Sequence, residues 1–205
     1  MLQRGRSPGV SELSFSKLFL VTDALLAARV TAFAAPAALS TTQDVVRLVR
    51  PALGAGADAG VVAEETLALV ATLTARAAET GLRARPDALA AAGPALAEVP
   101  FLYHDYLLGA QMVAAGAEGD VAPDASVYDR LARKAEFYGV HLPPGRFPGP
   151  SVLAEKLPLW MGRVSPPRLP TTPHERLGAL GIADVLAVHT RLVLAFAQKA
   201  AQDDG

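Results

Sequence analysis

Hydrophobic residues recur along this chain at the three- and four-residue spacing of helices, and the short β-branched runs give strands little support. The first stripe predicts a core-facing helix that begins near Ser11 or Ser14: Leu18, Val21, Leu25, Ala28 and Ala32. We expect Pro36 to end this helix, because proline lacks the amide hydrogen that a helix interior needs.

The pattern predicts two further helices before residue 82. A short one follows Ser40 and bends or ends at Pro51. A longer one covers residues 62–80, and its inward stripe is Leu67, Val70, Leu73 and Ala77. Gly81 stands where a helix often ends, so we expect it to take a positive φ.

Three more helices are predicted in the middle of the chain. Asp87 opens a short alanine-rich helix, which we expect Gly93 and Pro94 to break. Residues 101–115 read as a helix that stops at a glycine. Residues 123–138 form the next predicted helix, with an inward stripe of Val127, Leu131 and Ala135.

Prolines concentrate late in the chain, where residues 143–173 hold nine of the sixteen. One short helix fits within this stretch, over residues 151–162, with Leu153, Leu157 and Trp160 on one side. The last helix has the clearest start signal. Thr172 and Glu175 form a capping box, and Pro173 occupies the first helical position.

The pattern predicts an all-α fold, a single-domain helical bundle of about seven to eight helices. We expect four parts: a loose N-terminal arm at 1–10, a helical core at 11–142, a proline-rich strap at 143–172, and a C-terminal helix at 173–205 that packs on the core.

The predicted core contains two segments of similar sequence, which we call the echo. Residues 56–81 and 116–140 both run from small residues through an acidic turn into a helix that stops at glycine. At an offset of 58, Leu73 matches Leu131 and Gly81 matches Gly139. The echo predicts a pseudo-duplicated turn–helix unit.

Composition supports helices over membrane spans. The chain is 51% hydrophobic with a mean hydropathy of +0.28, but alanine, the best helix former, supplies much of this. The apolar run 18–35 contains Asp23 and Arg29, so we expect a buried or amphipathic helix there, with membrane contact as the less favoured alternative. The absence of cysteine excludes disulfides and thiolate sites and fits a cytoplasmic location.

Charge is unevenly distributed along the chain. Residues 57–125 carry ten Asp and Glu against three Lys and Arg, between two mildly basic ends. An acidic middle favours a cation or a basic partner. Nucleic acid is excluded as the main ligand, because no long basic stripe with interleaved aromatic residues is present.

Acidic side chains cluster at the two turns of the echo. They are Asp58, Glu64 and Glu65 in the first turn and Glu118, Asp120 and Asp124 in the second. Hard divalent cations bind several oxygen ligands together, so these six residues are the candidate metal ligands if the turns converge. Acidic residues at helix starts also cap free amides, which is the competing interpretation.

Enzyme signatures are sparse in this sequence. The four histidines have no metal-binding helical spacing, and no nucleophile elbow, phosphate-binding loop or dinucleotide fingerprint occurs. His189 lies on an apolar helix, where a histidine is usually a satisfied core residue. The enzymatic alternative is a small metal-dependent or small-molecule enzyme with a site around His104 and Tyr106.

Residues 112–124, continuing to Gly139, run through a small-residue helix, an acidic glycine turn, a hydrophobe and acids that open the next helix. This order resembles the turn–helix signature of TerB-like (tellurite-resistance type) domains, and residues 58–65 resemble it too. The resemblance implies an all-helical, duplicated fold whose acidic residues are associated with metal ions and with stress-response or envelope-linked assemblies. Two departures are Ala59, which separates Asp58 from Gly60, and the inverted order of Gly119 and Asp120.

These observations favour a non-enzymatic helical interaction or scaffold protein, with a protein partner or self-association and a divalent cation as the candidate cofactor. We expect its partner-binding groove to use the apolar residues of 147–161 or the helix that contains Leu18.

Overall fold

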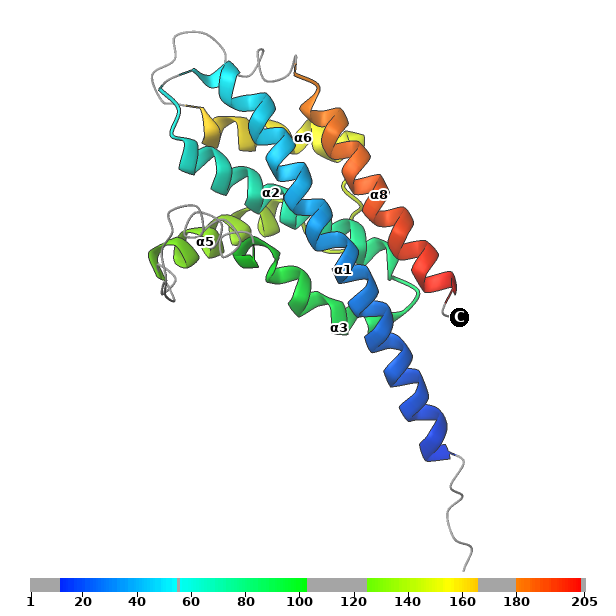
Figure 1. Ribbon diagram of the computed structural model, residues 1–205. Coiled ribbons are helices and arrows are strands. Elements are labelled where there is room, and N and C mark those ends of the chain that lie inside the picture. Colours follow the sequence, from blue (N-terminus) through cyan, green and yellow to red (C-terminus); the bar gives the residue numbers. More distant parts are fainter. Residues whose placement is uncertain (1–11, 55, 103–124, 166–179, 204–205) are drawn as a thin grey trace, which may run out of the picture.

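The structure, a computed structural model, describes residues 12–54, 56–102, 125–165 and 180–203, where it is all-helical and has no strand (Figure 1). This confirms the predicted all-α class. Six helices lie in these ranges, fewer than predicted, partly because the two expected N-terminal helices are one. Their bounds are α1 Glu12–Leu53, α2 Ala59–Gly81, α3 Pro86–Ala97, α5 Ala125–His141, α6 Pro150–Val164 and α8 Ile182–Asp203.

Helix α1 is continuous over 42 residues and passes through Pro36 and Pro51, so the prediction that Pro36 ends it is wrong. Both prolines are exposed. The backbone hydrogen bond that each proline removes is therefore lost on the solvent side, where water can bind the carbonyl. Contacts of α1 with α2, α3 and α8 stabilise the helix despite this loss. Figure 1 shows the N-terminal end of α1 extending beyond the other helices.

The buried face of α1 is not the predicted one. Leu25 is 60% exposed, and Ala28 and Ala32 are exposed as well; the side chains of Leu18 and Val21 lie outside those the structure describes. The residues that do face the core are Leu26, Val30, Ala34, Ala38 and Val45. The prediction was wrong because α1 carries apolar residues on two faces, and the described helices cover only one of them.

Helix α2 contacts each of the other five described helices and forms the centre of the bundle. Its predicted inward stripe is confirmed, since Leu67, Val70, Leu73 and Ala77 are all buried. Gly81 ends the helix, but it does not have the expected positive φ. A Cβ atom at Gly81 would lie 2.5 Å from the Cβ of Ala197, so this glycine instead lets α8 approach α2 closely.

Helix α3 continues through Gly93 and Pro94, contrary to the predicted break. Pro94 is exposed, so the carbonyl that it leaves without an amide partner faces solvent. Ala92 and Leu96, which lie on either side of Pro94 in sequence, are buried against the core and stabilise the helix there. Tertiary packing therefore decides the outcome at this site over local propensity.

The two units of the predicted echo differ at their ends. Helix α2 stops at Gly81, whereas α5 passes Gly139 and continues to His141. The turn at 116–124 lies outside the described residues. Helices α2 and α5 pack against each other, and their duplication stays a prediction.

The described part of the proline-rich strap contains a core helix. Helix α6 confirms the predicted helix at 151–162 and buries Leu153, Leu157 and Trp160. Helix α8 begins only at Ile182, because Gly181 has a φ of +66°, a conformation that favours glycine. The helix predicted from residue 173 is therefore interrupted at Gly181, and its part before residue 180 lies outside the described residues. Thr172 and the arm at 1–10 lie outside the described residues.

Candidate functional site

The first predicted acidic turn does not gather its three carboxylates. Asp58 is the N-cap of α2, and its Oδ1 accepts hydrogen bonds from the backbone N–H groups of Gly60 at 2.8 Å and Val61 at 3.2 Å. Glu64 and Glu65 lie further along α2 and face cationic side chains of other helices. Asp58 therefore has the capping geometry that the competing interpretation predicted.

Glu64 joins α2 to α5. Its Oε1 accepts a hydrogen bond from Arg130 at 3.1 Å, and its Oε2 accepts one from Lys134 at 2.7 Å. Burial would raise the pKa of Glu64, but the hydrogen bonds and charges of Arg130 and Lys134 more than offset this and lower it. Glu64 is therefore held as a carboxylate between two cations.

Glu65 is 3% exposed and pairs with Arg163 of α6 and, at 3.4 Å, with Lys134 of α5. Arg163 of α6 donates from Nε to Oε2 at 2.7 Å and from Nη2 to Oε1 at 2.8 Å, a bidentate geometry. The hydroxyl of Tyr138 donates to Oε2 at 2.9 Å, and burial, followed by the charge of Glu65, raises the pKa of Tyr138. Arg163 also lies 4.3 Å from the ring centroid of Phe137.

These contacts join α2, α5 and α6 through two carboxylates and three cations. Charged partners already occupy the oxygens of Glu64 and Glu65. Within the described ranges, no group of three or more His, Cys, Asp or Glu side chains could hold a metal ion. Glu118, Asp120 and Asp124 lie outside these ranges, so convergence of the two turns stays a prediction.

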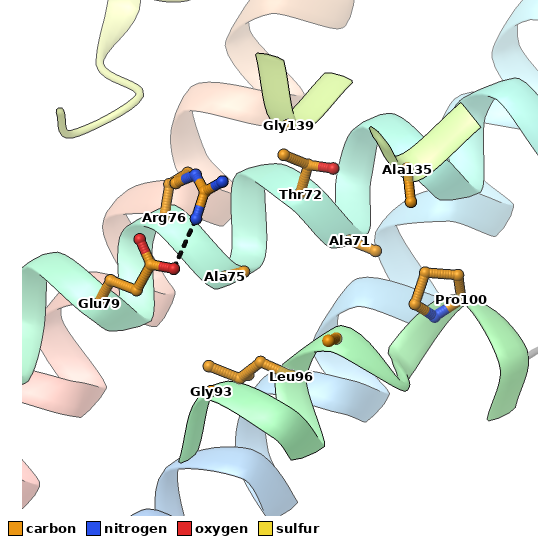
Figure 2. Close-up of a pocket in the computed structure, with 11 residues that line it drawn as sticks. Ala71, Thr72, Ala75, Arg76, Glu79, Gly93, Leu96, Pro100, Ala135 and Gly139 are labelled. Carbon is orange, nitrogen blue, oxygen red and sulfur yellow. Dashed lines mark hydrogen bonds and ion pairs between the residues drawn. The ribbon is translucent and has the colours of Figure 1, made fainter. Parts of the chain in front are cut away.

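A cavity of about 190 Å³ lies between α2, α3 and α5 (Figure 2). Small residues form much of its wall, including Ala71, Ala75, Gly93 and Gly139. Arg76 and Glu79 supply charge, with Nη1 and Oε1 2.6 Å apart, and Arg76 Nε donates to the Leu142 carbonyl at 2.6 Å. The lining residues include no nucleophile–base pair, so this cavity does not favour the enzymatic alternative.

His189 bridges α8 to two neighbouring helices from a buried position. Its Nδ1 lies 3.0 Å from the Thr41 hydroxyl of α1, and its Nε2 lies 2.7 Å from the Thr74 hydroxyl of α2. The Thr74 hydroxyl donates to the Val70 carbonyl, so it accepts from Nε2–H, and Nδ1 accepts from Thr41. Burial lowers the pKa of His189 to about 4, which keeps the ring neutral and makes it a weak base.

A groove of about 460 Å³ lies between α1 and α8, with His189 in its wall. Figure 1 shows these two helices side by side and running in opposite directions. Val188 and Leu192 line the groove from α8 and are 62% and 53% exposed. Asp44 of α1 and Asp184 of α8 line it as well. The groove is therefore mainly apolar, with two acids toward one end.

Exposed residues extend this groove along both helices, at helical spacing, into one long surface that we name the α1–α8 face. It consists of Leu25, Arg29, Ala32, Pro36, Ser40, Asp44 and Arg47 on α1, and Asp184, Val188, Arg191, Leu192, Ala195 and Lys199 on α8. Val188 and Leu192 stand at its middle, whereas Leu25 lies at one end, beyond Arg29. Exposed apolar side chains that line a groove are typical of an interaction site.

Part of α1, Thr22–Leu53, is long and apolar enough to cross a membrane by length and composition alone. Asp23 within this stretch is 8% exposed and pairs with Arg85, with Oδ1 and Nη2 2.6 Å apart. This ion pair ties α1 to the start of α3. The ion pair explains why Asp23 interrupts the apolar run at residues 18–35. The opposite face of α1 is exposed.

The other sequence-predicted sites do not form surfaces that the structure describes. The expected groove at 147–161 is wrong, because Leu157, Trp160 and Met161 are buried in the core. Their apolar character serves folding, since α6 packs on α2 and α8. His104 and Tyr106 lie outside the described residues.

Sequence reasoning missed the partners of Glu64 and Glu65. Arg130, Lys134 and Tyr138 recur every four residues and therefore lie on one face of α5, which was the available signal. Arg163 comes from α6, 98 residues from Glu65 in sequence, and no local pattern marks that pairing.

No protein-family model, curated protein or solved structure matches this chain.

Proposed function

We propose that this protein is a non-enzymatic helical interaction protein that self-associates through the α1–α8 face. One observation carries the proposal: large apolar side chains of two adjacent helices stand exposed on the same face. Leu25 is 60%, Val188 62% and Leu192 53% exposed. Isolated exposed hydrophobes are ordinary on soluble proteins, but a row of them along two neighbouring helices favours a partner.

The charges of the face are of both signs, which suits a protein partner but does not by itself separate it from a membrane. A membrane-binding helix usually carries an excess of basic residues on its polar side. The α1–α8 face carries Asp44 and Asp184 among the basic residues Arg29, Arg47, Arg191 and Lys199, and Asp44 pairs with Arg47 at 3.7 Å, so both signs are present. A second copy of the same face can supply both complementary charges.

The geometry also disfavours the histidine as a catalytic base. His189 touches the Thr41 hydroxyl, as a base touches a nucleophile, but its pKa of about 4 leaves it little basicity near neutral pH. Its other nitrogen contacts Thr74, a neutral group, where catalytic histidines are usually oriented by a carboxylate. The Thr41–His189–Thr74 chain is better explained as a polar link between helices.

Sedimentation velocity tests self-association. We expect the native chain to form a dimer at micromolar concentration, and Val188→Glu combined with Leu192→Glu to shift it to monomer. Val140→Glu is the matched control, because Val140 is 71% exposed on α5, away from the face. A native chain that is monomeric at 100 µM contradicts the proposal.

Flotation with anionic phospholipid vesicles separates the membrane alternative. We expect the native protein to stay with the soluble fraction. Flotation of the native chain that Val188→Glu and Leu192→Glu abolish would replace self-association with membrane binding as the role of the face.

The divalent cation and the stress-response or envelope-linked role implied by the TerB-like resemblance stay predictions, as does the cytoplasmic location. Thermal melts with calcium, magnesium, manganese or zinc test the cation, since binding to the folded state raises its stability. The expected signature is a raised melting temperature that Asp58→Ala or Asp120→Ala reduces. No shift with any ion contradicts it.

A further inference from the structure

We propose that the cavity between α2, α3 and α5 binds a small neutral molecule made of one ring and a hydroxyl group. The ring lies between walls of alanine and glycine, and the hydroxyl bonds to the ion pair of Arg76 and Glu79. The site does not depend on self-association through the α1–α8 face, because α2, α3 and α5 supply its walls.

The cavity exists because three helices each turn a pair of small residues toward one space. The members of each pair are four residues apart and so share a helix face: Ala71 and Ala75 on α2, Gly93 and Ala97 on α3, and Ala135 and Gly139 on α5. Among the described helices, α3 and α5 each pack on α2 but make little or no contact with each other. The side chains of these helices therefore leave a space of about 190 Å³ between them.

The cavity is open to a small molecule. Its floor is α2, where Ala71 and Thr72 are buried, whereas Gly93 and Gly139 in the walls are half-buried. A Cβ atom at Gly93 would meet no atom within 4 Å, so the α3 wall faces free space. A cavity of about 150 Å³ takes a benzene-sized molecule. One of about 190 Å³ therefore has room for a ring with a short substituent.

The ion pair of Arg76 and Glu79 forms a polar end of the cavity (Figure 2). A guanidinium has five N–H donors, and the bonds of Arg76 to the Leu142 carbonyl and to Glu79 use two of them. Nη2, which neither bond uses, lies 4.0 Å from the position that a Cβ atom at Gly139 would take. This nitrogen therefore faces the α5 wall and can donate to a ligand there.

Glu79 supplies the matching acceptor. Its Oε1 accepts a hydrogen bond from Arg76 at 2.6 Å, but its Oε2 is buried and has no hydrogen-bond partner within the described part of the chain. An oxygen in this position lowers the stability of the fold until a donor reaches it. The terminal torsion of a glutamate is soft, so the carboxylate can turn Oε2 toward a donor in the cavity.

A donor and an acceptor on one ion pair select the chemistry of the ligand. A hydroxyl group can accept from Nη2 of Arg76 and donate to Glu79 at the same time. The charges of Arg76 and Glu79 cancel as a pair, so a charged ligand would leave an uncompensated charge in a half-buried site, whereas a neutral ligand would not. The small apolar walls suit a ring, and together these features favour a phenol-like molecule.

Titrations with phenol and toluene test the ligand class, because these molecules differ only in a hydroxyl against a methyl group. In proton–nitrogen correlation NMR, we expect phenol to move the amide signals of Gly93 and Gly139 with a Kd of about 1 mM. Toluene should bind about tenfold more weakly, and Glu79→Gln should reduce that difference to about threefold. Glu98→Gln is the control, because Glu98 is exposed at the end of α3, and it should keep the native difference. Equal Kd values for phenol and toluene in the native chain overturn the proposed ligand class.

Filling the cavity tests its location. Gly93→Leu and Gly139→Leu add a side chain from opposite walls, and each should weaken phenol binding by about tenfold or more. Neither substitution starts with a clash, since the nearest atom to an added Cβ is beyond 4 Å at Gly93 and is Arg76 Nη2, 4.0 Å away, at Gly139. Gly162→Leu is the matched control, because Gly162 is a helical glycine with open space outside the cavity, and it should keep the native Kd. Native phenol affinity in both cavity variants overturns the site, and so does a native chain that binds no phenol at about 20 mM.

Discussion

The hydroxyl of Thr74 fixes the tautomer of the buried imidazole of His189. Because this hydroxyl donates its hydrogen to the Val70 carbonyl 2.7 Å away, it accepts the hydrogen of Nε2 at 2.7 Å. The contact joins α8 to α2 at a buried point, and it lies under the groove that separates α8 from α1. A neutral histidine in such a site makes the stability of the fold sensitive to pH.

Acidification should destabilise the protein through His189. Burial lowers its pKa from 6.5 to about 4, so between these values the unfolded chain binds a proton that the folded chain does not. The free energy of unfolding is therefore highest above pH 6.5 and falls as pH falls toward 4, by about 3 kcal/mol from this residue. Urea denaturation at pH 7.5 and 4.5 measures the change. His189→Gln should show a smaller difference between the two pH values, and an equal difference contradicts the assignment.

Removal of the Thr74 hydroxyl should leave the histidine donor without a partner. We expect Thr74→Val to lower the free energy of unfolding by about 1–3 kcal/mol, the usual consequence of an unsatisfied buried group. Thr72→Val is the matched control, because the Thr72 hydroxyl donates only to the Ala68 carbonyl of its own helix. Urea denaturation at neutral pH compares the two variants. Equal losses would show that the bond to His189 contributes nothing.

The neighbouring residues Glu64 and Glu65 should differ in their contribution to stability. Glu65 is buried and contacts Arg163 at 2.7 Å, Lys134 at 3.4 Å and the Tyr138 hydroxyl, so Glu65→Gln removes the charge that all three share and should lower the free energy of unfolding by about 3 kcal/mol. Glu64 pairs with Arg130 and Lys134, but its own side chain is 20% exposed against 4% for Glu65, and we expect Glu64→Gln to lower it by about 1 kcal/mol. Chemical denaturation of both variants measures the contrast, and a larger effect at Glu64 would contradict the burial argument.

The sequence predicted the helical class and the core of α2, because that helix has a single apolar stripe. It misassigned α1 for the opposite reason. Leu25, Ala28 and Ala32 keep helical spacing as well as Leu26 and Val30 do, and spacing alone cannot tell a core face from an interaction face. The two faces of α1 can be told apart only when it is known which one α2, α3 and α8 cover.

The candidate sites depended still more on tertiary structure. Capping by Asp58 follows from local geometry and was among the interpretations of the sequence. The pairing of Glu65 with Arg163 joins residues far apart in the chain, and so does the contact between Thr41 and His189. The predicted helix end at Pro36 and the predicted break at Pro94 were wrong for a related reason. Exposed positions on packed helices tolerate a proline that an isolated helix would not.

The close approach of α2 and α8 at Gly81 gives a last prediction. A Cβ atom there would lie 2.5 Å from the Cβ of Ala197 and 3.0 Å from the Leu194 carbonyl oxygen, so backbone must move to admit it. Overpacking of this kind costs about 1–3 kcal/mol. We expect Gly81→Ala to lower the free energy of unfolding by that amount, despite the better helix propensity of alanine.

Gly162 provides the control for this prediction, because it is helical and an added Cβ would meet no atom within 4 Å. Gly162→Ala should therefore leave stability unchanged or raise it by about 0.5–1 kcal/mol. Combining Gly81→Ala with Ala197→Gly removes the nearest clash but not the one with the Leu194 carbonyl, so it should recover only part of the loss. If Gly81→Ala is as stable as Gly162→Ala in urea denaturation, the two helices do not require a glycine at their contact.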